Sequence, residues 1–407
     1  MVNSEKQINY DTSYNQNFYC QLKINDIPII PGNIISLVIR EWALELVPRI
    51  HLVFQDDGVF SEINTIQDLD TITVELARTP DTKLETTYTG TFSVLDWKCN
   101  LLADNRLHLI EVTGFLNIPS LFAPIKTRAF RNKNSIDVLS SIGYELGLDV
   151  IKRNNFSNNA DTMTWLQVNQ SNSDFLKHVT SYAFRNEDLI MCYADSKKQL
   201  NITSLNTELD KKEEISGKYN IDKFTSNVLS DEDINVLWYS SYDYVNVNGY
   251  LNKLNNYGRS GNYYDLSKNK EFSVTDNSHK FSELGFKNEN FKASIVKQDT
   301  YNIQSKNVHA NFLKAKSQND YLINNFFGYS LVINAHASVK IDLMDTVMLS
   351  VPSLPYHDPD SINELLTGRY LVGGIVYMIG KNTGFQKHVS LHRNGFNKSF
   401  FQKSYNL

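Results

Sequence analysis

Apolar and polar positions alternate with a period of two along several segments of the first 118 residues. The alternating segments are 37–42, 50–55, 72–78, 88–99 and 107–115. Because successive side chains of a strand point to opposite faces, this period predicts strands that bury one face. Short clusters of Asp, Asn, Gly and Pro separate the segments and are typical of turns. Several strands in succession favour an antiparallel barrel or sandwich.

From Ser135 onward the apolar positions follow the period of a helix. The stripe consists of Ile136, Leu139, Ile142 and Leu146. Asn134 or Ser135 can cap the start of this helix, and Gly147 suits the position just past its end. A second helix is expected after the Asn-Ser-Asp sequence at 172–174. A small α/β unit is completed by three short strands, at 165–168, 189–193 and 200–204.

The remaining chain alternates between polar connections and β segments. Residues 205–235 are polar and charged and are expected to form a connection, after which strand texture returns at 236–247. Residues 252–290 lack periodicity and predict a long loop or an irregular extension, and a helix is expected over 306–326. Four strands are predicted near the C-terminus, at 330–340, 346–351, 370–379 and 386–393. Asn382-Thr383-Gly384 is a candidate hairpin turn. Two β units that flank other material are compatible with a diverged internal duplication.

Composition and charge argue against several classes of function. The 407 residues carry a net charge of −5 without a basic stripe, whereas nucleic-acid binders show a basic surplus. Residues 1–16 lack the apolar core of a signal peptide, and no stretch approaches the roughly 18 apolar residues of a membrane span. Cys20, Cys99 and Cys192 are too far apart for a zinc ribbon or a thioredoxin-like pair, and their sparse, odd count suits a reducing compartment. We expect a soluble protein without membrane insertion or sequence-specific nucleic-acid binding.

The sequence offers no established pattern of catalytic residues. It lacks a G-x-S-x-G nucleophile elbow and a glycine-rich phosphate loop. His388 and His392 are the best metal candidates, but the flanking alternation predicts a strand, on which they would lie about 13 Å apart. We therefore expect a protein that is not an enzyme, with no catalytic, cofactor-binding or metal-binding residues and no cofactor.

Other polar and aromatic candidates have structural interpretations. Asp56-Asp57 and Asp358-Pro359-Asp360 lie in turn contexts, where Asp caps backbone groups. Gly373-Gly374 lies within a predicted strand and indicates a bulge or bend. The four tryptophans fall within predicted strands, so core packing is preferred over a sugar-stacking platform: Trp42, Trp97, Trp165 and Trp238.

Five segments of the sequence stand out together, at 130–139, 165–176, 187–202, 368–377 and 387–393. Their order and patterns resemble those of phage late control proteins and of the spike proteins of type VI secretion systems. Residues 130–139 look like the entry to the inserted domain of that family, with Asn-Lys-Asn-Ser before an apolar helix. Residues 165–176 resemble the family's strand, polar turn and Phe-Leu helix, and residues 187–202 resemble the strands that follow. Residues 368–377 and 387–393 resemble the final hairpin of baseplate hubs, in which a G-x-Y-x-V strand precedes an apolar return strand.

The resemblance implies a central hub protein of a phage baseplate, of the T-even type. The sequence departs from the family at Asp345, where relatives often have Gly, and residues 252–300 match no part of the family. No spike sequence follows the hub before Leu407, which implies that the spike is a separate protein.

The implied fold is α+β and mainly β, with two tube-like antiparallel β-barrel or sandwich domains, an inserted small α/β domain and a helix-containing extension. The first tube-like domain is expected at 1–118 and is completed by roughly 225–250. The α/β domain is expected at 119–205, the extension at 251–325 and the second tube-like domain at 326–407.

The implied function is structural. Two β units in each of three chains would supply six positions, so a homotrimeric ring could adapt a six-fold tail tube to a three-fold spike. The implied partners are further copies of this chain, a separate spike protein, tail tube or tube-initiator proteins and the tape measure protein. The implied location is the tail baseplate of the virion, after assembly in the cytoplasm of a bacterial host. The alternatives are a receptor- or carbohydrate-binding tail protein and a tail-associated cell-wall hydrolase.

Overall fold

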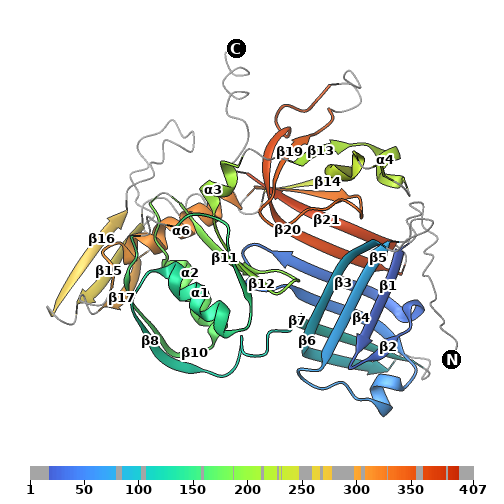
Figure 1. Ribbon diagram of the computed structural model, residues 1–407, viewed down its shortest axis with the longest axis horizontal. Coiled ribbons are helices and arrows are strands. Elements are labelled where there is room, and N and C mark those ends of the chain that lie inside the picture. Colours follow the sequence, from blue (N-terminus) through green and yellow to red (C-terminus); the bar gives the residue numbers. More distant parts are fainter. Residues whose placement is uncertain are drawn as a thin grey trace.

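The structure is a computed structural model with a mainly β architecture, which confirms the predicted fold class (Figure 1). It describes residues 18–78, 85–101, 107–156, 160–186, 188–211, 215–226, 229–230, 232–246, 259–265, 269–276, 298–303, 308–327, 329–353, 361–381 and 384–393. One continuous sheet contains 13 strands, and three smaller sheets lie outside it. The large sheet comprises two β units that are joined through one long strand.

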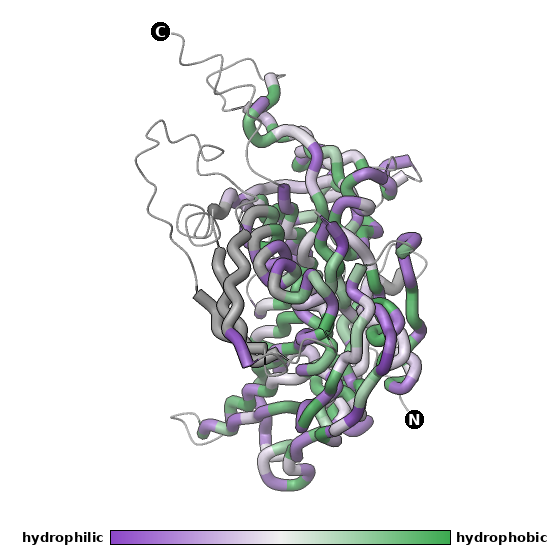
Figure 2. Tube along the Cα trace, turned by 90° about the vertical axis from the view of Figure 1, so that its left-hand side faces the viewer, coloured by the Kyte–Doolittle hydropathy of each residue, from purple (hydrophilic) through white to green (hydrophobic). Residues whose placement is uncertain are grey.

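The first β unit is an open antiparallel sheet. Its strands are β1 (Phe18–Ile24), β2 (Ile27–Ile29), β3 (Ile34–Trp42), β4 (Arg49–Asp56), β5 (Thr71–Arg78), β6 (Glu85–Leu101) and β7 (His108–Leu116), with short helical turns η1 (Pro31–Asn33) and η2 (Val59–Ile63) between strands. The strands lie in the order β3-β4-β7-β6-β5-β1-β2. Alternate residues such as Leu37, Ile39, Leu52 and Phe54 are buried, as their period predicted. Figure 2 shows hydrophobic and hydrophilic stretches alternating along the chain trace.

The second β unit is a closed barrel of six strands. Its strands are β13 (Ile215–Tyr219), β14 (Val236–Asn246), β18 (Tyr329–Ala335), β19 (Thr346–Ser350), β20 (Gly368–Gly380) and β21 (Gly384–His392). They follow the order β13-β14-β18-β21-β20-β19, and β19 pairs with β13 to close the ring.

The barrel corrects two expectations about the middle of the chain. Residues 225–250 were expected to complete the first unit, but β14 pairs with β13 and β18 of the barrel. Residues 205–235 were expected to form only a connection, but they contain β13 together with the short helices α3 (Leu205–Leu209) and α4 (Ile221–Thr225) and the turn η3 (Asp233–Asn235). Pairing with distant strands, which local pattern does not reveal, decides both assignments.

The two β units share one chain order and one spatial order of strands. In sequence order, β1, β3, β4, β5, β6 and β7 correspond to β13, β14, β18, β19, β20 and β21. Corresponding strands are neighbours in both units, in the orders β3-β4-β7-β6-β5-β1 and β14-β18-β21-β20-β19-β13. One direction differs, since β1 pairs antiparallel with β5 whereas β13 pairs in parallel with β19. The common order supports an internal duplication.

The long strands β6 and β20 also share a bulge. Each skips one residue against its hairpin partner, at Leu95 in β6 and at Gly373 in β20, which confirms the bulge predicted at Gly373-Gly374. Beyond the bulge, β20 stays paired with β21 on one side, and on the other side residues 374–380 leave β19 and pair antiparallel with β3. This pairing joins the barrel to the first sheet.

Two glycines allow β20 to make this crossing. A Cβ atom on Gly374 would lie 2.2 Å from Cε3 of Trp42, and one on Gly373 would lie 2.3 Å from Cδ2 of His392. The rings of Trp42 and His392 meet edge to face, with their centroids 5.6 Å apart. The backbone of β20 therefore packs against these rings in space that any larger residue would occupy.

The α/β unit lies between β7 and β13 along the chain. It contains β8 (Lys126–Lys133), α1 (Ser135–Glu145), β9 (Asp149–Lys152), β10 (Met163–Gln170), α2 (Asn172–Tyr182), β11 (Ile190–Ala194) and β12 (Gln199–Ser204). Asn134 caps α1 by accepting a hydrogen bond from the Asp137 N–H at 2.8 Å. Ser171 caps α2 by accepting one from the Asp174 N–H at 3.0 Å. Gly147 has a φ of 72°, as expected of a residue that ends a helix.

Strand β11 links the α/β unit to the β units because both of its faces are buried. Ile190 and Cys192 pack into the core formed with α1 and α2, whereas Met191 and Tyr193 pack into the core of the β units. A strand with two buried faces has an uninterrupted apolar sequence, and the five residues of β11 are all buried.

The extension between β14 and β18 was expected to include a long loop or an irregular extension over 252–290, of which the structure describes residues 259–265 and 269–276. It contains a three-stranded sheet of β15 (Arg259–Asp265), β16 (Lys270–Asp276) and β17 (Gln298–Ile303), followed by α6 (Phe312–Phe326). The loop alternative was wrong over these two strands, because β15 and β16 are too rich in polar residues to show an apolar period. Helix α6 packs against α2, where the rings of Phe312 and Tyr182 stack with centroids 4.1 Å apart.

Candidate interaction surface

The two histidines of β21 that were considered for metal binding have separate partners. Nε2 of His388 lies 3.2 Å from Oε1 of Gln386, and Nδ1 of His392 lies 3.1 Å from the carbonyl oxygen of Tyr329. Burial lowers the pKa of His392 to about 4. Among the described residues, no group of three or more His, Cys, Asp or Glu side chains is placed to hold a metal ion.

Asp56 organises the turn after β4, as its sequence context predicted. Its carboxylate accepts hydrogen bonds from the N–H groups of Gly58, Phe60 and Ser61 and from the hydroxyl of Ser61, at 2.7–3.2 Å. Burial alone would raise the pKa of Asp56, but these donors outweigh it, so the pKa is lowered. This Asp therefore has a structural role. The second acidic turn, Asp358-Pro359-Asp360, and the turn residues Asn382 and Thr383 lie outside the described residues.

The four tryptophans lie in the core or at its margin, which confirms the packing interpretation. Trp165 and Trp238 are buried, and their Nε1 atoms donate to the carbonyl oxygens of Lys133 and Asp233 at 3.0 Å each. Trp42 and Trp97 are half-buried.

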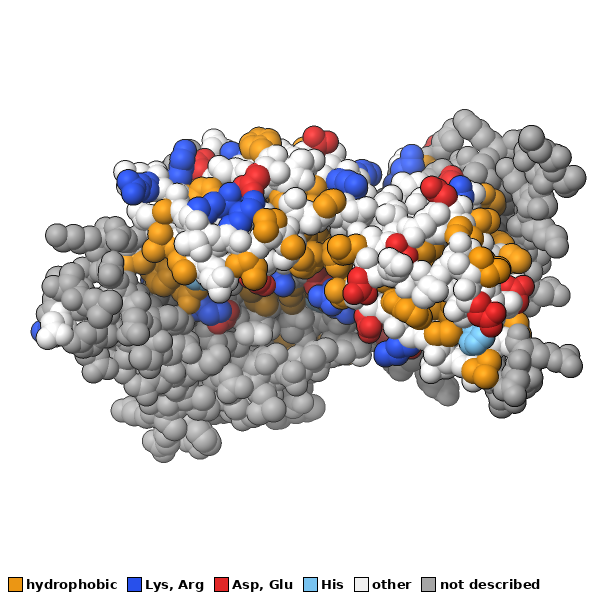
Figure 3. All heavy atoms as spheres, turned by 90° about the horizontal axis from the view of Figure 1, so that it is seen from below, with side chains coloured by type: hydrophobic (Ala, Val, Ile, Leu, Met, Phe, Trp, Pro, Cys, Tyr) orange, Lys and Arg blue, Asp and Glu red, His pale blue; other side chains and the backbone are white. Residues whose placement is uncertain are grey.

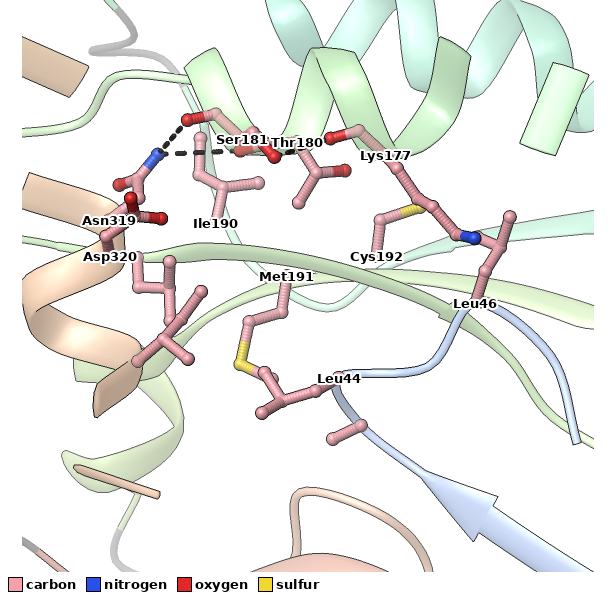
Figure 4. A pocket seen from close by; sticks show the side chains of 13 residues that line it. Leu44, Leu46, Lys177, Thr180, Ser181, Ile190, Met191, Cys192, Asn319 and Asp320 are labelled. Carbon is pink, nitrogen blue, oxygen red and sulfur yellow. Dashed lines mark hydrogen bonds between the residues drawn. The ribbon is translucent and has the colours of Figure 1, made fainter. Parts of the chain in front are cut away.

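A small cavity lies between the residues after β3, helix α2, strand β11 and helix α6 (Figure 4). Leu44, Leu46 and Met191 supply apolar walls, and Lys177 and Asp320 supply charged groups. Its volume of about 140 Å³ is well below the roughly 300–1,000 Å³ of a typical small-molecule site. The space can hold a single side chain but is too small for a cofactor.

Buried polar side chains gather where the two β units meet. Glu41 of β3 and Lys387 of β21 both occupy core-facing positions and are almost fully buried. Burial, with a smaller contribution from Asp195, raises the pKa of Glu41 to about 7, and burial lowers the pKa of Lys387 to about 8. Nζ of Lys387 donates to the carbonyl oxygen of Val339 at 2.7 Å, whereas Oε1 of Glu41 has no hydrogen-bond partner among the described residues. At this junction, burial thus favours the neutral forms of both groups.

The outer half of β6 combines an open edge with apolar side chains. β5 pairs with β6 only as far as Ser93, and the backbone hydrogen bonds on that side end at Val94. Residues 95–101 keep β7 on one side, and no described strand pairs with the other. Leu95 and Leu101 are 59% and 55% exposed, and Cys99 is exposed as well. An open apolar edge of this kind is a template for a further strand.

Strand β14 has a comparable open edge. β13 pairs with it only over residues 236–239, whereas β18 pairs along its other side as far as Asn246. The part beyond residue 239 has no second neighbour among the described strands. Tyr244 is 39% exposed, although its cross-strand neighbour Leu331 is buried inside the barrel. A core-facing tyrosine left exposed at an edge indicates a surface that another chain can cover.

The lower face of the molecule carries separated charge. In Figure 3, Lys and Arg gather over the lobe that holds the α/β unit, whereas Asp and Glu are more frequent over the lobe of the first β unit. Strand β8 alone contributes Lys126, Arg128, Arg131 and Lys133, the first two of which pair with Glu145. Faces of opposite charge favour contacts between unlike sides of two molecules.

Comparison with known proteins identifies the fold through structure alone. Neither protein-family models nor curated protein sequences match the chain. The chain is similar to the 43 kDa tail protein of prophage MuSo2 from Shewanella oneidensis, with a TM-score of 0.56 and 12% identity over 93% of this chain and 100% of that one. It is also similar to a tail protein from Neisseria meningitidis MC58, with a TM-score of 0.54 and 10% identity over 93% and 97%. A component of the E. coli type VI secretion system aligns less closely, with a TM-score of 0.47 and 11% identity over 91% and 76%.

The described residues contain no helix that is long and apolar enough to cross a membrane. The two likenesses with the higher TM-scores extend over nearly the whole of both partners. The chain has the fold of phage tail proteins.

Proposed function

We propose that this chain is the central hub protein of a phage baseplate or of a related contractile injection machine. Three copies form a ring that adapts a six-fold tail tube to a three-fold spike. The observation that carries the proposal is the strand order shared by the two β units. Three chains with two similar units each present six similar units, so one ring can match both symmetries.

The proposed hub acts by assembly and is not an enzyme. Its partners are further copies of the chain, a separate spike protein, tail tube or tube-initiator proteins and the tape measure protein. It works in the tail baseplate of the virion and is assembled in the bacterial cytoplasm. The open edges of β6 and β14 support self-association, because unpaired strand edges at the surface are otherwise aggregation hazards. The receptor- or carbohydrate-binding alternative gains no support from the four packed tryptophans.

Light scattering after size exclusion, over a range of protein concentrations, tests the proposal. One chain has a mass of 46.7 kDa, so a trimer has a mass of 3 × 46.7 = 140.1 kDa. We expect the trimer mass to dominate at high concentration. A stable mass near 46.7 kDa at every concentration, or a stable dimer, would contradict the ring.

A further inference from the structure

We propose that the open edge of β6 in one copy pairs antiparallel with the open edge of β14 in the next copy, with Cys99 opposite Tyr244. This inference rests on the proposed ring and specifies the contact that closes it. The partner is a second copy of this chain, and the contact extends over residues 97–101 of one copy and 242–246 of the other.

The junction inside each chain is the template for this contact. Beyond its bulge, β20 of the barrel pairs through residues 374–380 with β3 of the first unit. By the shared strand order, β6 corresponds to β20 and β14 corresponds to β3. The outer half of β6 and the outer half of β14 are therefore the matching halves of a second junction, and neither has a second neighbour among the described strands. In a ring, each chain contacts the next one in the same way. One surface of each chain must therefore bind a different surface of its neighbour.

The bulges set the register on the β6 side. Leu95 is the skipped residue of β6 and Gly373 is that of β20, so Cys99 corresponds to Tyr377, four residues farther along in each strand. Within the chain, Tyr377 lies opposite Ile39 of β3.

The ladders of paired residues set the register on the β14 side. Next to the bulge of β6, Val94 pairs with Gly114, which pairs with Ile50, which pairs with Ile39. Next to the bulge of β20, Val372 pairs with Leu391, which pairs with Leu331, which pairs with Tyr244. Tyr244 is thus the counterpart of Ile39. The pair Tyr377–Ile39 inside the chain becomes Cys99–Tyr244 between chains.

Burial of the corresponding residues agrees with this register. Ile39 is fully buried and Tyr377 is 6% exposed at the internal junction, whereas Tyr244 is 39% exposed and Cys99 is exposed at the two open edges. Both exposed residues lie on the core side of their sheets, because their cross-strand neighbours Ile110 and Leu331 are buried. Pairing would bury these two exposed side chains.

The neighbouring positions of the same register are also compatible. On the core side, Leu101, which is 55% exposed, would lie opposite Tyr242, which packs partly against the core. On the outer side, Asn100 would lie opposite Asp243, with Lys98 one pair farther along. Opposite charges on diagonal neighbours of an antiparallel pair are favourable.

Disulfide formation tests the pairing, because Cys99 is already present. Directly opposed residues of antiparallel strands have Cα atoms about 4.5–5.5 Å apart, within the range that a disulfide spans. We expect Tyr244→Cys to form disulfide-linked trimers under mild oxidation, seen on a non-reducing gel. The removal of Cys99 in a Cys99→Ala, Tyr244→Cys double variant should abolish them. Asp243→Cys is the register control, since its side chain points to the other face and should form at least 10-fold less product.

The outcomes separate this inference from the proposed function. A protein of trimer mass in which Tyr244→Cys does not form the disulfide, or in which Asp243→Cys forms it equally well, overturns the pairing but leaves the ring. A protein that remains monomeric in light scattering overturns both. Covalent trimers that require both Cys99 and the cysteine at position 244 support both.

Discussion

At Gly374 the backbone of β20 passes so close to the Trp42 indole that a single added methyl group would collide with it. On the opposite face, which is the core side, Glu41 and Lys387 lie across from Ile375 and Tyr377 of β20 and are almost fully buried. The junction between the β units thus depends on one missing side chain and two buried ionisable ones. Both features lead to measurable predictions at the scale of single residues.

Gly374→Ala should lower the free energy of unfolding by about 1–3 kcal/mol, because the new Cβ would lie 2.2 Å from Cε3 of Trp42. Urea unfolding followed by fluorescence measures the change. Gly32→Ala is the matched control, since its Cβ would meet nothing within 4 Å. Equal stability of Gly374→Ala and the unmodified protein would show that β20 does not pass under Trp42 as described.

Glu41→Gln should remove a dependence of stability on pH. Burial raises the pKa of Glu41 from 4.5 to about 7, so the folded protein holds this proton more tightly than the unfolded chain does. Stability is therefore lost as the pH rises from about 4.5 to about 7. The lowered pKa of Lys387 acts above this window, where stability is regained as the pH rises from about 8 towards 10.5.

The expected size of this effect follows from the same values. Between pH 5 and pH 7.5, Glu41→Gln should gain about 2 kcal/mol relative to the unmodified protein. Unfolding midpoints in urea at the two pH values, at one fixed protein concentration, provide the measurement, and Glu62→Gln on an exposed side chain is the control. An unchanged difference between Glu41→Gln and the unmodified protein at the two pH values would mean that Glu41 is ionised throughout.

At the scale of elements, helix α2 shows how a local sequence signal becomes stability. Oγ of Ser171 accepts a hydrogen bond from the Asp174 N–H at 3.0 Å and donates to Oδ2 of Asp174 at 2.7 Å. This reciprocal cap satisfies one of the free N–H groups at the helix start. The apolar face of α2 then packs into the core of the α/β unit through residues such as Phe175 and Val179.

Ser171→Ala should lower the free energy of unfolding by about 1 kcal/mol, because it removes the cap of α2. Ser181→Ala is a suitable control, since Ser181 is on the same helix and its exposed hydroxyl donates only to the Lys177 carbonyl. We expect a change within about 0.5 kcal/mol for the control. Comparable losses in both variants, measured by chemical denaturation, would argue against a specific capping role.

The sequence predicted elements well where one face of a strand or helix is buried. Residues 37–42 and 72–78 showed the expected alternation, and Asn134 and Gly147 marked the ends of α1. Strand β13 was missed because its core-facing position is Gly217, which contributes no apolar side chain to the alternating pattern. A larger residue does not fit there, since a Cβ atom would lie 2.6 Å from Cδ1 of Leu349. Strands β15 and β16 were missed because polar residues dominate them.

The candidate interaction surface could not be predicted from the sequence. The alternation around Trp97 and Cys99 is that of an ordinary half-buried strand, and nothing local shows that β5 ends at the level of Ser93. Likewise, the openness of β14 near Tyr244 depends on the end of β13 at Tyr219, which is set by pairing between distant segments. The presence of two β units was visible in the sequence, but their matching strand order was not.

At the scale of the whole molecule, the chain is a pair of related β units with material inserted at two places. The α/β unit follows β7, and the extension replaces the short connection that joins β3 to β4 in the first unit. The internal junction joins the two units through β20 and β3. The same junction, repeated between chains, would generate a closed ring without any further type of contact.

Leu101→Asp should weaken self-association without lowering the stability of the single chain, because the side chain is 55% exposed at the open edge of β6. A charge placed in a strand-to-strand contact is costly, so we expect the concentration for half-assembly to rise at least 10-fold. Sedimentation velocity measures this concentration. Tyr144→Asp is the control, since Tyr144 is 65% exposed but lies on α1 of the α/β unit. Equal effects of both substitutions would place the contact elsewhere.

The central claim is that three chains present six similar β units around one axis. The most direct test is the rotational symmetry of the assembled particle in class averages of electron micrographs viewed along its axis. We expect a ring with a central hole, three-fold symmetry overall and six similar lobes at the radius of the β units. A ring of another order, or a three-fold particle with only three such lobes, would contradict the claim that the shared strand order serves to match two symmetries.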